Sequence, residues 1–169
     1  MKLAYLAGRF SPTKAELREL RYKFYGTSDP NVRKDKLVEA AINLKITEII
    51  NRNIANAVHA SALLAIAGEG RYGVVCPHAA FAPIWSKIKE IAPDSDLCAP
   101  DSDFWYKSSL ALLESCEGIV MLPGWEESIG AVRERDSAYN DGKPIERMRS
   151  ITLPLAQIII AKFDKVLNG

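Results

Sequence analysis

The fold of this chain is decided by one stretch, which runs Gly118-Ile119-Val120-Met121-Leu122-Pro123-Gly124-Trp125-Glu126-Glu127-Ser128-Ile129-Gly130-Ala131-Val132-Arg133-Glu134. Its apolar start is typical of a buried strand. A glycine-containing turn follows, and residues 128–140 have the pattern of a helix. This order predicts an anion site, because the first N–H groups of a helix lack intrahelical partners and the helix dipole favours negative charge there.

Glu134 is the candidate catalytic residue of this stretch. It lies one helical turn after Gly130 and one turn before Ala138, so the three residues are predicted to share a helix face. A carboxylate placed between two small residues near a sheet can attack an anomeric carbon and hold a glycosyl intermediate. A surface glutamate paired with a neighbouring basic side chain would have the same spacing, so both interpretations stay open.

The composition predicts one ordinary globular domain over residues 1–169, with 48% hydrophobic and 25% charged residues. A formal net charge of +1 gives no electrostatic reason to expect nucleic-acid or membrane binding. The three cysteines have neither metal-ligand nor disulfide spacing, and we recognise no signal peptide. We therefore expect a cytoplasmic protein without a metal or cofactor.

Strands predicted at residues 2–7, 72–76 and 118–122, with a possible fourth at 143–148, alternate with helical patterns. This alternation predicts an α/β fold, a Rossmann-like doubly wound parallel sheet of four to five strands flanked by helices. The helices that follow the first strand are expected within residues 12–51 and at 53–67, 82–91, 104–115, 128–140 and 153–167.

Residues 12–51 form a charged segment with helical periodicity. Ser11-Pro12 predicts the first helix start, with serine as N-cap and proline at the first helical position, and Asp29-Pro30 repeats this pattern. Further along the chain, Pro77-His78 is expected to form a turn, and residues 93–103 a loop rich in aspartate and proline.

Ligands of parallel sheets bind beyond the carboxyl ends of the strands. This rule brings together Gly8-Arg9-Phe10, His78 and residues 123–130. Gly8 permits close backbone approach, and Arg9 could hold a phosphate or a carboxylate, although an arginine after a strand is commonly just solvated. His78 could stack on a base or form a hydrogen bond with it.

Ser128 and the turn before it, which includes Gly124, form a candidate phosphate cradle. The Ser128 side chain can cap the helix and leave the N–H groups of Gly130 and Ala131 facing a ligand. A plain N-cap without a ligand has the same sequence. The pattern therefore predicts the cap and leaves the ligand open.

Asp101 and Asp103, together with Trp105 and Tyr106, form an acidic and aromatic cluster. An aromatic ring can cover a nucleobase, and an aspartate can exchange a proton with a base nitrogen. The alternative for Asp103 is a capping role ahead of the helix that begins near Phe104.

The chain resembles the nucleoside 2-deoxyribosyltransferase superfamily, in particular a bacterial and phage branch with the signature Pro-Gly-Trp-Glu-x-Ser-x-Gly-Ala-x-x-Glu. The resemblance covers residues 1 to about 147, apart from about 12–51, which is a helical insertion relative to compact members. The matching residues are Tyr5-Leu6-Ala7-Gly8, Asn53-Ile54 with Ala57, Cys76-Pro77-His78, residues 113–120, Leu122-Pro123-Gly124-Trp125-Glu126, Ser128, Gly130-Ala131, Glu134, Ala138 and Gly142-Lys143-Pro144.

The resemblance implies cleavage of an N-glycosidic bond. Glu134 would attack the sugar C1′, Tyr5 would orient it, and a second base or water would resolve the intermediate. Ser128 stands where the nucleoside 5′-monophosphate N-glycosidases carry a serine, which implies a nucleotide substrate, and those enzymes also have a histidine at the position of His78. Members typically complete their sites across a dimer, so a homodimer or higher homo-oligomer is expected.

One departure from the family concerns the residue that assists the leaving base. Many members carry an aspartate on the helix before the third strand, and spacing to Glu117 places Ser109 there. Either Asp101 or Asp103 substitutes, or base protonation is weak, or the protein binds nucleotides without turnover. A phosphoribohydrolase loop of the form Pro-Gly-Gly-x-Gly-Thr-x-x-Glu matches less well, because Trp125 replaces its second glycine.

Overall fold

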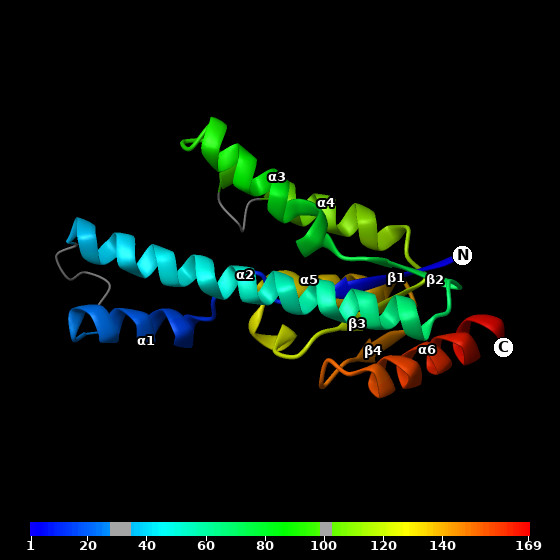
Figure 1. The fold of residues 1–169 in the computed structure, drawn as a ribbon. Coiled ribbons are helices and arrows are strands. Elements are labelled where there is room, and N and C mark those ends of the chain that lie inside the picture. The colour runs from blue at the N-terminus through cyan, green and yellow to red at the C-terminus, as the bar shows by residue number, and fades with distance from the viewer. Residues whose placement is uncertain (28–34, 99–102) are drawn as a thin grey trace.

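The computed structural model describes residues 1–27, 35–98 and 103–169 and contains a four-stranded parallel sheet (Figure 1). The strand order is β2-β1-β3-β4. The strands are β1 (Lys2–Ala7), β2 (Tyr72–Val75), β3 (Gly118–Met121) and β4 (Ile145–Arg147). Every adjacent pair is parallel, which confirms the predicted α/β class with a Rossmann-like sheet.

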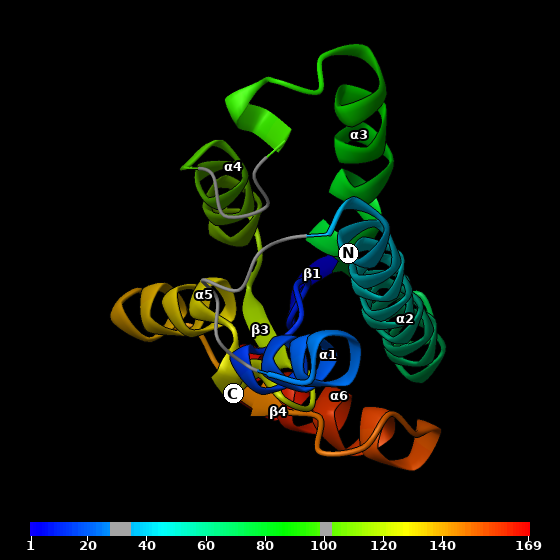
Figure 2. The same cartoon turned by 90° about the vertical axis from the view of Figure 1, so that its left-hand side faces the viewer.

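Helices cover both faces of this sheet (Figure 2). They are α1 (Lys14–Tyr25), α2 (Lys36–Ala67), α3 (Pro77–Ile91), α4 (Asp103–Glu114), α5 (Ile129–Asn140) and α6 (Leu153–Asn168), with short 3-10 turns η1 (Asp96–Cys98) and η2 (Trp125–Glu127). Ala4 and Leu6 of β1 belong to the core beneath α2 and α6, whereas Tyr5 and Ala7 belong to the core beneath α4 and α5. This period of two explains why β1 is apolar throughout, since a strand buried on both faces has no solvent side.

The first helix begins two residues later than the sequence predicts. The N-cap of α1 is Thr13, whose Oγ1 accepts a hydrogen bond from the Glu16 N–H at 3.0 Å. The Glu16 carboxylate in turn accepts from the Thr13 N–H at 2.9 Å. The predicted Ser11-Pro12 start was wrong because this reciprocal capping box satisfies two backbone donors at Thr13. The Asp29-Pro30 start lies outside the described residues.

The long helix α2 runs without a break, so the predicted boundary between residues 51 and 53 was wrong. Asp35 caps it by accepting from the N–H groups of Leu37 and Val38. No glycine or proline occurs from Lys36 to Ala67, and the chain therefore has no reason to end the helix earlier. The helical insertion after β1 is accordingly a hairpin of α1 and the first half of α2, which projects beyond the sheet (Figure 1).

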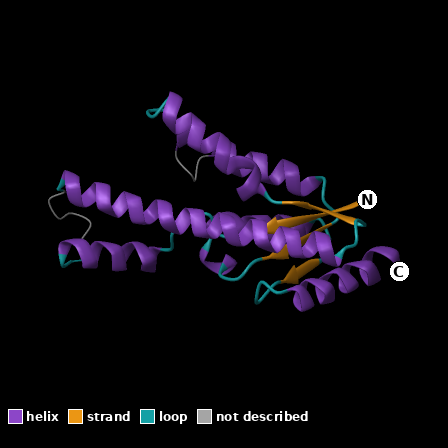
Figure 3. Cartoon of the chain, in the orientation of Figure 1, coloured by secondary structure: helices purple, strands orange, loops and turns teal. Residues whose placement is uncertain are grey.

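The helix α3 begins at Pro77 instead of residue 82, so Pro77-His78 does not form the predicted turn. Proline suits the first helical position because its fixed φ matches the helix and its missing N–H would have no partner there. His78 therefore lies in the first turn of α3. The strands gather at one end of the molecule, and α1, α2 and α3 extend past their carboxyl ends (Figure 3).

Candidate active site

A cavity of about 750 Å³ lies beyond the carboxyl ends of the strands. Its wall is built from the residues after β1, the start of α1, the first turns of α3 and α4, and the start of α5. This is the place that the sheet topology predicts for a ligand. Of the residues predicted for the site, the cavity is lined by Gly8, Phe10, His78, Trp105, Ser128, Gly130, Ala131 and Glu134.

Glu134 is a buried carboxyl group in the wall of this cavity, with a relative exposure of 6%. The hydroxyl of Tyr5 donates a hydrogen bond to Glu134 Oε1 at 2.7 Å. Tyr5 is fully buried in β1, so the sheet fixes its ring. Ala138 shares the buried face of α5 with Glu134, as predicted. The second small residue on that face is Ala131, because Gly130 is exposed.

Burial governs the protonation of this pair. Loss of solvation raises the pKa of Glu134 to about 7, against the opposing effect of hydrogen bonds from Tyr5 and Ser109. Burial and the adjacent Glu134 also raise the pKa of Tyr5 far above its ordinary value. Tyr5 therefore keeps its proton and donates it, while Glu134 is divided between carboxylate and acid near neutral pH.

Ser109 is a site residue that the sequence identified only as a departure from the family pattern. It is buried on α4, lines the cavity and acts on the Glu134 carboxyl group through hydrogen bonding. The position is therefore close to Glu134, and a serine there supplies a neutral donor. The spacing to Glu117 was sufficient to locate the position, although it could not show this contact.

His78 is a neutral ring packed among apolar groups. Its ring centroid lies 5.8 Å from that of Phe10, and the backbone of Gly8 forms a hydrogen bond with it. Burial lowers the pKa of His78 to about 4. Its Nδ1 is buried and has no hydrogen-bond partner within the described part of the chain. His78 can therefore offer a ligand a polar atom without a charge.

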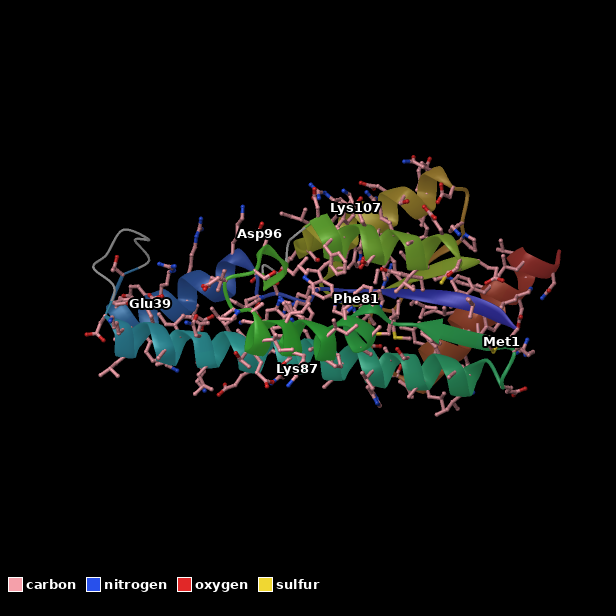
Figure 4. All side chains as sticks on the ribbon, turned by 90° about the horizontal axis from the view of Figure 1, so that it is seen from above. Met1, Glu39, Phe81, Lys87, Asp96 and Lys107 are labelled. Atoms are coloured by element: carbon pink, nitrogen blue, oxygen red, sulfur yellow. The ribbon has the colours of Figure 1, made fainter. Side chains whose placement is uncertain are left out.

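Aromatic side chains form much of the cavity wall. Phe10 meets Trp85 edge-on, with ring centroids 5.6 Å apart, and Phe81 lies 5.5 Å from Trp105. Phe81 is on the side of α3 that faces α4 (Figure 4). The Trp105 indole is fixed by donation to the Leu97 carbonyl at 2.9 Å. Such rings bind planar ligands by stacking.

The sequence analysis missed Phe81 and Trp85 because it placed the start of α3 too late. With the helix beginning at Pro77, residues 78, 81 and 85 recur at helical spacing and point to one face. The run of aromatics at that spacing was the available sign. Tyr106 also lines the cavity, and the Arg133 guanidinium lies 5.1 Å from its ring centroid.

Ser128 is the N-cap of α5, as predicted, and its Oγ accepts a hydrogen bond from the Ala131 N–H at 3.3 Å. The expectation that the Ala131 N–H would face a ligand was therefore wrong, because the cap uses it. Gly130 is exposed at the cavity, and a Cβ built on it would meet only Ser128 Oγ at 3.9 Å. A ligand can therefore approach the helix start closely at Gly130.

Arg9 does not line this cavity, although the sequence predicted it as a binding residue. Its guanidinium pairs with Glu16 at 3.0 Å and with Glu127 at 3.4 Å. Arg52 joins the same network through Glu16 at 3.1 Å. Arg9 therefore ties α1 to η2 and borders a smaller hollow of about 250 Å³ shared with Arg52. Its charge is already compensated, which weakens the case for phosphate binding.

Gly124 and Asp103 also lie outside the cavity lining. Gly124 adopts the left-handed conformation, with φ of 76°, at the turn into η2, so glycine is needed there for the backbone. Asp103 is exposed at the first position of α4 and does not line the cavity. Asp101 lies outside the described residues. The chain segments that the structure describes contain no group of three or more His, Cys, Asp or Glu side chains placed to hold a metal.

Comparison with known proteins gives one partial match. Residues 98–147 are similar to a family described as a domain of unknown function (DUF4406). The matched segment includes Trp105, Ser109, Ser128 and Glu134, which all line the cavity. No curated protein and no solved structure shows a significant match to the chain. Among the described residues, no helix is both long and apolar enough to cross a membrane.

Proposed function

We propose that this protein cleaves or transfers the N-glycosidic bond of a (deoxy)nucleoside 5′-monophosphate, with Glu134 as nucleophile. The observation that carries the proposal is a buried carboxyl group, held by the Tyr5 hydroxyl at 2.7 Å, in the wall of an aromatic cavity. Burying an ionised carboxyl group is costly, and a buried carboxyl group with a raised pKa in a cavity is a candidate functional residue. The resemblance to nucleoside 2-deoxyribosyltransferases provides a use that fits the geometry.

In the proposed reaction, a Glu134 carboxylate oxygen forms a bond to C1′ while the bond from C1′ to the base nitrogen breaks. The bonding electrons leave with the base, and a glycosyl ester of Glu134 remains. Attack by water releases the sugar phosphate, whereas attack by another base completes a transfer. Tyr5 holds one carboxylate oxygen in place, which leaves the other to react.

The start of α5 is the proposed phosphate site. A hydroxyl at Ser128 and exposed backbone at Gly130 suit an anion, because unpaired N–H groups and the dipole lie at the helix start. Lys14 and Arg133 also line the cavity and supply positive charge. Arg9 does not line the cavity and already pairs with Glu16, so the proposed phosphate site does not include it.

The proposed base site is the aromatic wall around Phe10 and Trp105. Neither Asp103, which does not line the cavity, nor His78, with its pKa of about 4, is suited to protonate the leaving base at neutral pH. We therefore expect turnover to favour bases that leave readily as anions, such as electron-poor pyrimidines.

Incubation with a panel of deoxynucleoside monophosphates, including modified pyrimidines, tests the proposal. Free base measured by chromatography is the expected product. Glu134→Gln should abolish its release, whereas Glu127→Gln, which removes another carboxyl group that lines the cavity, should retain most of it. Absence of release from every substrate would overturn the catalytic proposal.

A nucleotide-binding or sensing module without turnover is the second candidate. Ser109 favours it, because a serine beside Glu134 replaces the aspartate that many relatives use on the leaving base. In that case 5′-monophosphates would raise the melting temperature of the protein, and no base would be released from any of them. If no nucleotide raised the melting temperature, both candidates would fail.

A further inference from the structure

The solvent-facing side of α2 carries a continuous stripe without charge. Its buried residues, among them Asn53, Ala57, Ala60 and Leu64, face the body of the molecule. The helix lies along one outer side, with α1 and the sheet behind it and α3 above it in the view of Figure 1 (Figures 1 and 4). The opposite stripe recurs every three or four residues and consists of the exposed Leu37, Ala40, Leu44, Thr47, Asn51, Ala55, Val58, Ala62 and Ile66.

This composition is unusual for a helix face in water, which normally carries charged side chains. Leu37 is 82% exposed, Leu44 is 62% exposed and Ile66 is 61% exposed. At ~1.5 Å per residue, the stripe extends for about 44 Å from Leu37 to Ile66. A mostly apolar strip of this length on an exposed surface is typical of an interface.

The stripe has nearly the same pattern in both directions from Asn51. Leu44 and Val58 lie seven residues on either side of Asn51, and Ala40 and Ala62 lie eleven residues on either side. Thr47 and Ala55 are each four residues away, and the stripe ends in large apolar residues on both sides. A surface that is its own complement when reversed fits a second copy of itself around a twofold axis.

We propose that α2 packs antiparallel against α2 of a second copy of this chain, with the twofold axis at Asn51. Leu44 then meets the partner's Val58, and the small residues on each side of Asn51 allow the helices to approach. The two Asn51 amides can form hydrogen bonds with each other, since each has both donors and an acceptor.

The charges beside the stripe select the antiparallel direction. Glu48 and Arg52 border the same side of it, and both side chains stay more than half exposed although Glu48 pairs with Lys45 and Arg52 with Glu16 within the chain. In the antiparallel arrangement Glu48 lies opposite the partner's Arg52, which is favourable. In a parallel pair around a twofold axis, the border that carries Glu48 and Arg52 would face the opposite border of the partner helix, so these two residues could not pair across the interface. The homo-oligomer expected from the sequence is thus assigned a specific surface.

The size of the stripe sets the expected strength of the association. A contact about 44 Å long and ~10 Å wide covers roughly 450 Å² on each copy, or about 900 Å² in total, which is in the range of weak, transient interfaces. We therefore expect a reversible dimer that forms at micromolar concentrations. The surface lies on the outer side of α2, so the dimer does not depend on the proposed catalytic function.

Sedimentation velocity over a wide range of concentrations tests this surface. The wild-type protein should pass from monomer to dimer. Leu44→Glu alone and Val58→Lys alone should each shift the protein to monomer, since each places charge in the contact. The double variant carrying both changes in one chain should recover the dimer, because each new glutamate then meets a lysine of the partner.

The double variant distinguishes the antiparallel arrangement from every parallel one in register, in which glutamate would meet glutamate and lysine would meet lysine. Ile158→Glu is the matched control, since Ile158 is an exposed apolar residue of α6 away from the stripe, and it should leave dimerisation unchanged. Circular dichroism checks that helix content is retained. A wild-type protein that stays monomeric, or single variants that remain dimeric, would overturn the proposal.

Discussion

Replacing Glu134 with glutamine should change how the stability of the fold depends on pH. The wild-type carboxyl group is buried, and loss of solvation raises its pKa to about 7. In the unfolded chain it should titrate near its ordinary pKa of 4.5. Glutamine has nearly the same shape but cannot ionise, so Glu134→Gln represents the neutral form of the side chain at every pH.

The expected magnitude follows from the two pKa values. A difference between 4.5 and about 7 corresponds to roughly 3 kcal/mol, at ~1.36 kcal/mol per pKa unit. Because the folded-state pKa is raised, this stabilisation is present below the unfolded pKa and is lost as the pH rises through the folded one. The free energy of unfolding of the wild-type protein should therefore fall by ~3 kcal/mol relative to that of Glu134→Gln between about pH 4.5 and pH 8.

Urea unfolding at several pH values between about 4 and 8 measures this difference. For a chain of this length, the gap near pH 8 corresponds to a melting temperature roughly 6–12 °C higher for Glu134→Gln than for wild type. Glu126→Gln is the matched control, because Glu126 is exposed at the neighbouring turn η2. That control removes an exposed carboxyl group and should not reproduce the pH-dependent gap expected of Glu134→Gln.

The test depends on how the difference in free energy of unfolding between Glu134→Gln and wild type changes with pH. An altered hydrogen bond between Tyr5 and the glutamine would add the same amount to that difference at every pH. A difference between Glu134→Gln and wild type that stays constant from acid to alkaline pH would refute the argument. It would mean that water or a cation solvates the Glu134 carboxylate in the folded protein.

Three further outcomes are expected at the same site. If base release occurs, its rate should rise with pH through about 7, because only the deprotonated Glu134 can attack, and a pH–rate profile measures this. Tyr5→Phe removes the donor to Glu134, so it should destabilise the fold by about 1–3 kcal/mol in chemical unfolding and move the pH–rate profile to higher pH. Ser128→Asp should lower the affinity for 5′-monophosphates at least tenfold in calorimetric titrations, because a carboxylate repels phosphate. The affinity for free nucleosides should stay nearly unchanged. An equal loss of affinity for both would contradict the proposed phosphate site.

The sheet could be predicted from the sequence because each of its main strands is a short apolar run, and two of these runs are followed directly by glycine or proline. Gly8 follows β1, and Pro123-Gly124 follows β3, so the limits of these strands were clear. Helix starts were predicted less well, because capping depends on which side chain folds back on the backbone. Thr13 caps α1 in preference to Ser11 because Glu16 completes the capping box.

The chemistry of the site was only partly accessible from sequence. Ser128 and Glu134 lie on one continuous motif, and their local spacing was enough to place them. The contact of Tyr5 with Glu134 was expected only from the family resemblance, because it spans 129 residues and depends on the sheet beneath α5. The pairing of Arg9 could not be predicted, because its partner Glu16 comes from the insertion, where sequence alone gave no reason to expect an ion pair across the turn.

The burial that makes Glu134 costly for the fold is also what would make it effective as a nucleophile. In an apolar wall the carboxylate is poorly solvated, so it gains more from a sugar carbon that develops positive charge than it would in water. Tyr5 and Ser109 moderate this effect by hydrogen bonding, which keeps the pKa near 7. A more polar site would ionise Glu134 fully but stabilise the transition state less, whereas a drier one would leave it protonated. This balance is the physical reason for proposing Glu134 as a nucleophile.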